Sequence, residues 1–443
     1  MRYEKYKQTG TKWITSIPVS WDMQKIGALF VQRKEKVSDK DFAPISVTKN
    51  GILPQLATAA KTDDGDNRKK VCVGDFVINS RSDRKGSCGV SDLKGSVSLI
   101  NIVLQPRDQL SGRYAHYLLR NHLFSEEYYR NGRGIVADLW TTRYSEMKTI
   151  LLPVPPHAEQ DQIVRYLDWQ VSKINRLIAA KRKQIALLKE HRTAKINQAV
   201  TTGIHCDTQL AYTGYNWLPY APANWNPVPA KALFRNITEL RRLDDSMLAA
   251  TQKYGLIEQT EYMRLEGRRI VLANDNLDKW LHTEPNDFII SLRSFQGGLE
   301  MCSKPGCVTW HYVVLRSQRN IYPDFYKWFF KSAAYIGALQ KTSDFIRDGQ
   351  DLRFSNFVKV GLFIIPMDEQ REIAEYLNRE ISKYDVAISN LEKQIDQITE
   401  LRTRLISDVV TGQIDVRGIE VPEFEYVGEA DVAEEQDEES EVG

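Results

Sequence analysis

Three charged residues have a spacing that could support metal-dependent hydrolysis. Asp138 is followed by Glu146 and, two residues later, by Lys148. In Mg²⁺-dependent nucleases, acids at such a spacing hold the ion and a lysine stabilises developing charge. The corresponding later segment, from Asp351 to Val358, has lost the glutamate and the lysine. A Mg²⁺-dependent endonuclease is therefore kept as an alternative hypothesis only.

The sequence contains no established catalytic motif. It has no G-x-x-x-x-G-K-[ST] phosphate loop, no G-x-S-x-G nucleophile elbow and no H-E-x-x-H zinc motif. Its 7 His and 5 Cys are scattered, without a C-x-x-C pair, so neither a metal centre nor a disulfide framework is expected. We predict that the chain is not an enzyme and that it binds no metal or cofactor itself.

Instead, the sequence repeats itself. Gly10-Thr-Lys-Trp13 returns as Gly214-Tyr-Asn-Trp217, and Gly74-Asp-Phe-Val-Ile78 returns as Asn286-Asp-Phe-Ile-Ile290. Near the end of each copy, Glu159-Gln160-x-x-Ile163 matches Glu369-Gln370-x-x-Ile373. These matches keep their order over almost the whole chain, which predicts two copies of one architecture.

Each copy begins with a stretch of short apolar runs and turn signals, residues 1–154 and 205–365. Strands are predicted at 75–79, 96–104, 287–291 and 307–315, because β-branched and aromatic residues alternate with turn residues there. Aromatic-rich helices are predicted at 114–129 and 323–340. Each stretch is thus expected to be a mixed α+β domain.

Each copy ends with a long helix, at 155–204 and 366–414. Apolar residues recur there in steps of three and four, the pattern of a helix that packs on another helix. Prolines mark the starts, and Thr202-Gly203 and Thr411-Gly412 mark the ends. The predicted fold class is α+β, with two tandem domains separated by an antiparallel coiled coil and related by pseudo-twofold symmetry.

The charge is distributed unevenly along the chain. From residue 422 to 443 there are ten acids and no Lys or Arg, and the rest of the chain has 60 basic and 48 acidic residues. A basic body suits a polyanion such as nucleic acid, and residues 415–443 are expected to form a disordered acidic tail. The scattered cysteines and the lack of an apolar run of about 18 residues favour a cytoplasmic protein.

These features resemble the specificity (S) subunit of type I restriction-modification systems of bacteria and archaea. The resemblance depends on the two Pro-x-x-Glu-Gln-x-x-Ile helix starts, on Trp13 and Trp21 with Trp217 and Trp225, and on the two Asp-Phe strands. It covers nearly the whole chain except the acidic tail. Each motif is short, but their duplicated order is specific.

The resemblance implies a function in phage defence. Each mixed domain would be a target-recognition domain that reads one half of a split double-stranded DNA site, and the helices would be the spacer. Two methyltransferase (M) subunits would dock on the chain, joined by restriction (R) subunits. S-adenosylmethionine, ATP and Mg²⁺ would be bound by those partners.

Polar and basic residues in matching loops of both copies are the candidate DNA contacts. Basic residues at matched positions are assigned to phosphates: Lys49, Arg81 and Arg143 in the first copy, and Lys253, Arg293 and Arg353 in the second. The residues of these loops assigned to base reading are Asn50, Arg84, Lys85, Tyr254 and Gln296. Ser82 and Ser294 are further candidate DNA contacts in the same loops.

The helix starts carry a second candidate site, formed by Glu159, Gln160, Glu369 and Gln370. Acids in a first helical turn interact favourably with the helix dipole, so capping is one interpretation. The other is that these side chains anchor the partner or the preceding domain. Two alternatives remain for the whole chain: a fused specificity-and-cleavage Mg²⁺-dependent endonuclease, and a coiled-coil scaffold without DNA binding.

Overall fold

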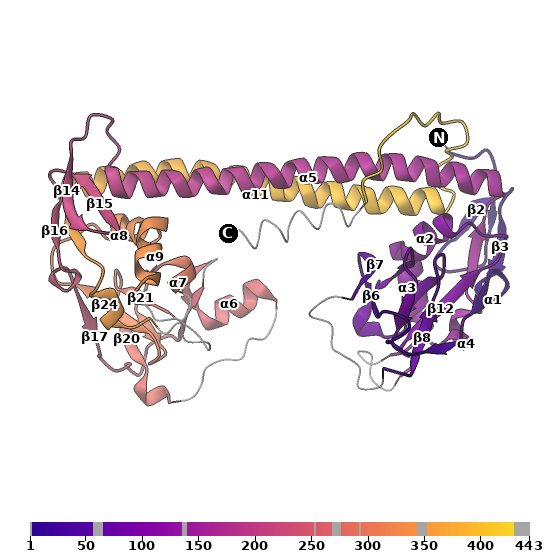
Figure 1. The fold of residues 1–443 in the computed structure, drawn as a ribbon, viewed down its shortest axis with the longest axis horizontal. Helices are drawn as coiled ribbons and strands as arrows, with labels where there is room; N and C mark the ends of the chain where they lie inside the picture. The colour runs from indigo at the N-terminus through magenta and orange to yellow at the C-terminus, as the bar shows by residue number, and fades with distance from the viewer. Residues whose placement is uncertain are drawn as a thin grey trace. The chain divides into compact units, whose positions relative to one another are not determined.

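The computed structural model describes residues 2–55, 65–134, 140–251, 254–267, 276–291, 294–342 and 352–428. The chain forms two compact units: unit 1 comprises Met1–Lys183 and Leu391–Gly443, and unit 2 comprises Gln184–Asn390. Each unit contains one mixed α+β domain and one segment of each of two long helices (Figure 1).

The domain of unit 1 is built around a four-stranded antiparallel sheet. Its order is β10 (Cys88–Val90), β9 (Phe76–Asn79), β12 (Asn101–Pro106) and β4 (Phe30–Gln32). A smaller sheet has the order β11 (Gly95–Val97), β8 (Arg68–Val71), β5 (Lys36–Val37). Three two-stranded pairs complete it: β1 (Tyr6–Gln8) with β2 (Ser16–Pro18), β3 (Asp22–Lys25) with β13 (Leu151–Val154), and β6 (Ile45–Thr48) with β7 (Gly51–Pro54).

The helices of this domain are short. They are α1 (Ile26–Leu29), the 3₁₀ turn η1 (Ser82–Arg84), α2 (Gly112–Arg120), α3 (His122–Arg130) and α4 (Tyr144–Met147). Helices α2 and α3 contribute buried Tyr114, Leu118, Phe124 and Tyr128 to the same core as Phe30 and Phe76 of the main sheet. The aromatic residues predicted to form a helix therefore cover one face of that sheet.

The domain of unit 2 repeats this plan. Its main sheet has the order β17 (Phe234–Ile237), β24 (Val313–Ser317), β21 (Phe288–Ile290), β22 (Glu300–Met301), which matches β4, β12, β9, β10. Its two-stranded pairs are β14 (Leu210–Tyr215) with β15 (Leu218–Pro222), β16 (Asn226–Val228) with β25 (Leu362–Ile364), β18 (Leu248–Thr251) with β19 (Gly255–Glu258), and β20 (Leu281–Thr283) with β23 (Gly306–Val308). Its helical elements are η3 (Ala230–Ala232), α6 (Gln259–Glu266), η4 (Leu277–Lys279), α7 (Ser294–Gly297), α8 (Pro323–Phe329), α9 (Ala333–Gln340) and α10 (Phe354–Phe357).

Two predicted strands are each two strands in the structure. The run 96–104 divides into β11 and β12, because a turn closed by the Asn101 N–H bond to the Ser98 carbonyl moves the chain from one sheet to the next. The run 307–315 divides into β23 and β24 at a turn where Tyr312 N donates to the Thr309 carbonyl. The sequence does not reveal these turns, because the buried strands on both sides of each turn consist of the same apolar residue types and read as one continuous run.

Two predicted helices are likewise divided at the same place in each copy. Asn121 separates α2 from α3, and its side chain accepts a bond from Phe124 N. Ser332 lies between α8 and α9, and its side chain accepts a bond from Tyr335 N. Both residues are N-caps, which satisfy the first unpaired N–H groups of a new helix.

The long helices are α5 (His157–Thr202) and α11 (Met367–Val410), and they pack against each other in each unit. In unit 1, Arg402 donates to Asn175 at 2.7 Å and Lys181 to Gln394 at 2.6 Å. Residue numbers rise along α5 while those of their partners on α11 fall, so the two helices are antiparallel, as predicted.

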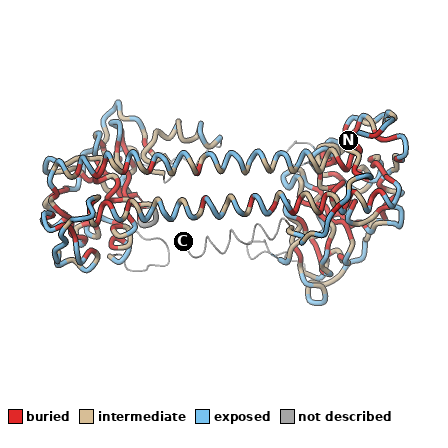
Figure 2. Tube along the Cα trace, turned by 90° about the horizontal axis from the view of Figure 1, so that it is seen from above, coloured by how far each residue is buried: buried red, intermediate tan, exposed pale blue. Residues whose placement is uncertain are grey.

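In unit 2 the pairing continues with the same direction. Arg192 donates to Asp385 at 2.9 Å, and Lys195 donates to the Tyr376 hydroxyl at 3.1 Å. Buried residues fill the domain cores and occur along the two helices only at intervals (Figure 2). A glycine with positive φ follows the end of each helix, Gly203 at +78° and Gly412 at +74°, as is common at helix C-termini.

The first part of the predicted acidic tail differs from the expectation of disorder. Residues 415–428 pack on unit 1, where Val416 is fully buried and Gln162 donates to the Val416 and Ile419 carbonyls. The expectation of disorder depended on the many acids after residue 422, and it overlooked the apolar residues that precede them. Residues 429–443 lie outside the described part of the chain.

Candidate nucleic-acid interface and domain anchors

The first candidate contact is a tight hairpin turn in unit 1. Lys49 and Asn50 form the two-residue turn between β6 and β7, and both are exposed. The turn is fixed from two sides: Thr48 Oγ1 accepts from Asn50 N at 3.1 Å, and the Lys49 carbonyl accepts from Arg120 at 2.8 Å. Two polar side chains are thus presented on a rigid backbone.

The matching turn of unit 2 is less available. Tyr254 lies between β18 and β19, its hydroxyl donates to Glu266 at 3.0 Å, and its ring packs edge-to-face on Tyr262. Lys253 lies outside the described residues. To read a base, as predicted, Tyr254 would therefore have to exchange its hydrogen bond to Glu266 for one to DNA.

The second candidate set follows β9. Arg81 is exposed, and the Arg84 side chain is 69% exposed, so both could reach a ligand. Ser82 N donates to the Trp140 carbonyl at 2.9 Å, which holds the turn. Lys85 is engaged within the domain, because its ammonium pairs with Glu126 and lies 6.0 Å from the centre of the Tyr129 ring.

The counterpart in unit 2 requires one correction. Ser294 is 1% exposed, and its hydroxyl accepts from Ser291 N at 2.8 Å. It is therefore a buried turn residue and not a surface contact. Arg293 and the side chain of Gln296 lie outside the described residues.

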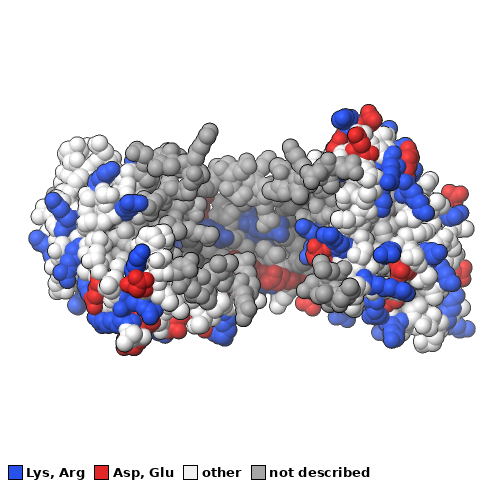
Figure 3. Space-filling model, turned by 90° about the horizontal axis from the view of Figure 1, so that it is seen from below, with Lys and Arg blue, Asp and Glu red and all other residues white. Residues whose placement is uncertain are grey.

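The third pair, Arg143 and Arg353, occupies equivalent positions. Each arginine directly precedes a four-residue helix, α4 or α10, and each is exposed. Each backbone N–H donates to the side chain three residues later, at 3.1 Å to Glu146 and at 3.1 Å to Asn356. Lys and Arg side chains are spread over the visible face of both domains, with Asp and Glu in smaller groups (Figure 3).

The alternative metal site receives no support from these contacts. Glu146 caps α4 through the Arg143 N–H and accepts a bond from Ser145, which lowers its pKa. Lys148 is exposed, and Asp138 lies outside the described residues. Among the described residues no group of three or more His, Cys, Asp and Glu is placed to hold a metal ion.

The glutamates at the helix starts anchor each domain to its long helix. Trp21 Nε1 donates to Glu159 Oε1 at 2.9 Å, and Trp225 Nε1 donates to Glu369 Oε1 at 2.9 Å. Glu159 also accepts from the Tyr3 hydroxyl at 2.5 Å. Burial and this bond raise the pKa of Tyr3. Each tryptophan comes directly before the strand, β3 or β16, that pairs with the last strand of its domain, β13 or β25, so each bond fixes where the domain begins on the helix.

The adjacent glutamines form a second brace. Gln160 Oε1 accepts from Ser111 N at 2.8 Å, and its amide donates to the Pro155 carbonyl at 2.9 Å. Gln370 Oε1 accepts from Tyr322 N at 2.7 Å, and its amide donates to the Ile365 carbonyl at 2.8 Å. Ser111 and Tyr322 are the N-cap residues of α2 and α8. Each glutamine therefore joins the helical layer of its domain to the long helix.

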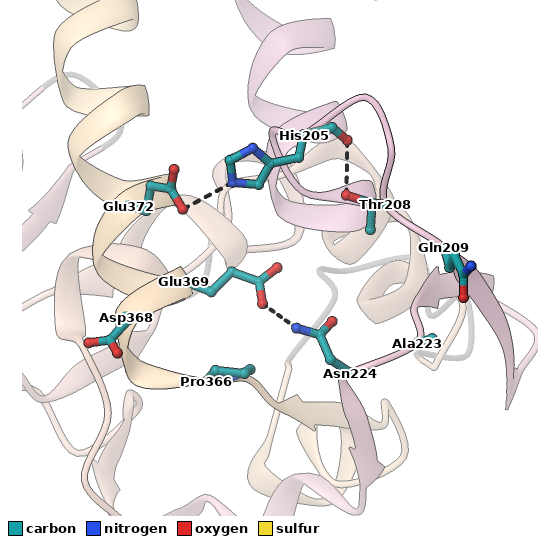
Figure 4. A pocket seen from close by; sticks show the side chains of 9 residues that line it. All are labelled: His205, Thr208, Gln209, Ala223, Asn224, Pro366, Asp368, Glu369 and Glu372. Carbon is teal, nitrogen blue, oxygen red and sulfur yellow. Dashed lines mark hydrogen bonds and ion pairs between the residues drawn. The ribbon is translucent and has the colours of Figure 1, made fainter.

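The surroundings of the two glutamates differ. In unit 2 the second oxygen of Glu369 accepts from Asn224 at 2.8 Å, beside a cavity of about 520 Å³ (Figure 4). His205 and Glu372 pair at 3.1 Å across the same cavity. In unit 1 the second donor to Glu159 is Tyr3, and the Arg417 guanidinium stacks 4.8 Å from the Tyr3 ring.

A scan of protein-family models finds no match to the sequence, and a search of curated proteins finds none either. Solved structures are similar to it. A chain from a structure of complex assembly and conformational transition of the type I R-M system is 14% identical, with a TM-score of 0.58, over 90% of this chain and 99% of that chain. This chain shares the fold of a type I restriction-modification protein. The resemblance predicted from the sequence is thus confirmed at the level of the fold.

Two further solved structures are similar to this chain. The HsdS subunit from Thermoanaerobacter tengcongensis is 14% identical, with a TM-score of 0.47, over 92% of this chain and 100% of that chain. The type I restriction-modification S subunit from M. genitalium is 15% identical, with a TM-score of 0.35, over 96% of this chain and 100% of that chain. In the described part of this chain, no helix is both long and apolar enough to span a membrane.

Proposed function

We propose that this chain is the DNA sequence-specificity subunit of a type I restriction-modification complex, with no catalytic activity of its own. The observation that carries the proposal is the duplicated anchoring. Two domains with the same strand order are each fixed to an antiparallel helix pair by the same Trp–Glu and Gln contacts. Such an architecture suits two reading heads on one scaffold.

Each domain reads one half of a bipartite double-stranded site. Arg143 and Arg353 contact phosphates at equivalent places, because they hold the same position before a short helix in both domains. Asn50 and Arg84 of unit 1 are exposed and reach base edges. Their counterparts in unit 2 differ in type, so the two half-sites differ and the whole site is asymmetric.

The paired helices carry the partners. A duplicated chain offers two related docking surfaces, so it recruits two copies of one partner. The expected partners are methyltransferase subunits, which supply S-adenosylmethionine chemistry, and restriction subunits, which use ATP and Mg²⁺. The solved chain that matches with a TM-score of 0.58 comes from a structure of complex assembly in the type I R-M system. This similarity supports the choice of partners.

The first test is the mass of the complex. The chain is purified with and without a candidate methyltransferase subunit from the same organism, and light scattering gives the stoichiometry. We expect two methyltransferases for each copy of this chain, and DNA methylation only when this chain is present. Methylation that does not require this chain would contradict the proposal. Cleavage of plasmid by this chain with Mg²⁺ alone would favour the endonuclease alternative.

A further inference from the structure

A second cavity lies within unit 1, beside the hairpin turn proposed to read DNA. It has a volume of about 530 Å³ and is bounded by β6–β7, by α2 and by α11. Asn50, the proposed base-reading residue, is part of its wall. Any ligand in this cavity would therefore compete with DNA for the same turn.

The lining of this cavity favours an anion. Arg120 and Arg402 contribute guanidinium groups, His116 and His122 contribute imidazoles, and Asp92 is the one acid among the described lining residues. Both arginines are held in place: Arg120 donates to the Lys49 carbonyl at 2.8 Å, and Arg402 donates to Asn175 at 2.7 Å. Fixed guanidinium groups pair well with carboxylates and phosphates, because little side-chain entropy is lost on binding.

The C-terminal segment is anchored at the edge of this cavity. Val427 N donates to Ser172 at 3.0 Å, its carbonyl accepts from Asn175 at 2.9 Å, and Glu425 pairs with Arg176 at 3.0 Å. Tyr426 and Gly428 line the cavity itself. The described chain thus ends where the basic lining begins.

The residues that follow are complementary in charge. Positions 429–443 contain eight acids and no Lys or Arg. Fifteen extended residues reach up to about 50 Å, at roughly 3.3–3.6 Å per residue, so the whole lining is within reach. A segment tethered this closely acts at an effective concentration in the millimolar range.

We propose that the acidic segment 429–443 docks on this basic surface of unit 1 and competes with DNA for it. The inference rests on the proposed DNA-binding function. Carboxylates of the segment take the place of DNA phosphates near Arg120 and the Lys49–Asn50 turn. A correct site, which adds base contacts, displaces the segment, whereas non-specific DNA displaces it less well. The segment therefore sharpens specificity by weakening non-specific binding.

Docking is tested directly with a peptide. A chain truncated after Gly428 is mixed with a fluorescent peptide of residues 429–443, and anisotropy is measured at low and high salt. We expect binding that weakens several-fold as salt rises, and that weakens several-fold in Arg120→Gln and Arg402→Gln. Arg107→Gln, an exposed arginine of unit 1 outside the cavity, is the matched control. Thermal unfolding checks that each variant is folded.

Competition is tested with DNA. The full chain is compared with the truncated chain and with a full chain whose eight terminal acids are changed to Gln or Asn, which leaves the cavity untouched. Both changed chains are expected to bind random duplex several-fold tighter, with the difference closing at high salt. Unchanged DNA affinity, or a peptide that binds the arginine variants as well as the control, would overturn the inference. If the peptide binds but no form of the chain, alone or with its methyltransferase, binds DNA, the proposed function fails while the docking stands.

Discussion

Trp225 and Glu369 are joined by a 2.9 Å hydrogen bond that spans 144 positions of the sequence, and Trp21 and Glu159 form the same bond across 138 positions. In both copies the indole belongs to the start of a domain and the carboxylate to the first turn of a long helix. The bond therefore ties the beginning of each domain to its end. Because Glu159 belongs to α5 and Glu369 to α11, this contact also fixes each domain on the long helix that follows it.

Removing either carboxylate should destabilise the unit that contains it. Glu159→Ala and Glu369→Ala each leave an indole N–H without its acceptor, at a cost of about 1–3 kcal/mol. Glu159→Ala should cost more, because Glu159 is 6% exposed and also accepts from Tyr3. Chemical unfolding and amide exchange in each unit would measure this.

Glu372→Ala is the control for the anchoring prediction. Its exposed carboxylate pairs with exposed His205, so its loss should change stability by no more than about 0.5 kcal/mol. If all three variants had equal stability, the anchoring interpretation would be wrong.

The sequence predicted the residues of these anchors and offered anchoring of the preceding domain as one of two interpretations, but it did not predict which residues pair. Trp21, Trp225, Glu159 and Glu369 were each recognised as repeated residues, because repetition is visible in one dimension. Their pairing was not predictable, since contacts across about 140 positions depend on how the strands return to the helix. The observation that both members recur in both copies was the available signal.

A buried ion pair illustrates the same limit. Asp75 and Asp287 lie at equivalent places in the repeated Asp-Phe motif, and both are 1% exposed. Asp75 pairs at 2.7 Å with Arg33, which follows β4, whereas Asp287 pairs at 2.7 Å with Arg316 on β24. Both aspartates pair with an arginine, but the two arginines lie at positions that do not correspond in the two copies. Aligning the two copies therefore could not identify the partner.

The glycines that end the long helices should respond differently to substitution. A side chain at positive φ costs about 1–2 kcal/mol, so Gly203→Ala and Gly412→Ala should both destabilise. A Cβ at Gly412 would lie 2.4 Å from Pro18 Cδ, whereas the nearest atom at Gly203 is 3.7 Å away. Gly412→Ala should therefore lower the midpoint of thermal unfolding further. A larger loss for Gly203→Ala would contradict this account of helix docking.

The stability of unit 2 should depend on pH through His282. Its Nδ1 lies 2.8 Å from Asp245 and its Nε2 lies 2.9 Å from Glu284. Burial lowers the pKa of His282, but bonds to Glu284 and Asp245 outweigh it, so the pKa is raised above its ordinary 6.5. The bond from His282 lowers the pKa of Glu284 below its ordinary 4.5.

The sign follows from these two directions. The imidazolium stabilises the fold fully below about pH 6.5, and this stabilisation is lost as the pH rises through the folded-state pKa. The Glu284 contribution is present above about pH 4.5 and is lost in more acidic solution. The unfolding free energy of the parent chain should thus exceed that of His282→Gln more at about pH 5.5 than at about pH 8.5. An equal difference at both pH values would show that folding does not raise the pKa of His282.

The arginines before α4 and α10 should affect the salt dependence of DNA binding. If each contacts one phosphate, Arg143→Ala and Arg353→Ala should each weaken binding to all sequences alike and reduce the salt slope by about 1. Titrations between about 50 and 200 mM salt, with the methyltransferase present, would measure this. Arg107→Ala, exposed in unit 1, should leave the slope unchanged. A change in the preferred sequence would instead assign these arginines to base reading.

Exchange of one domain should change one half of the recognised site. Residues 1–154 end just before α5, and the Trp21–Glu159 bond joins the exchanged part to the retained helix. A first domain from a related chain that keeps a tryptophan at this place should dock in the same way. The methylated sites of the hybrid complex, mapped on genomic DNA, should then differ in one half-site and keep the other half. A change in both halves would mean that the two domains read DNA jointly. If the hybrid loses methylation but a hybrid with a different donor domain keeps it, the first donor domain has failed to dock on α5. The reading loops of unit 2 are unchanged in both hybrids and cannot explain the loss.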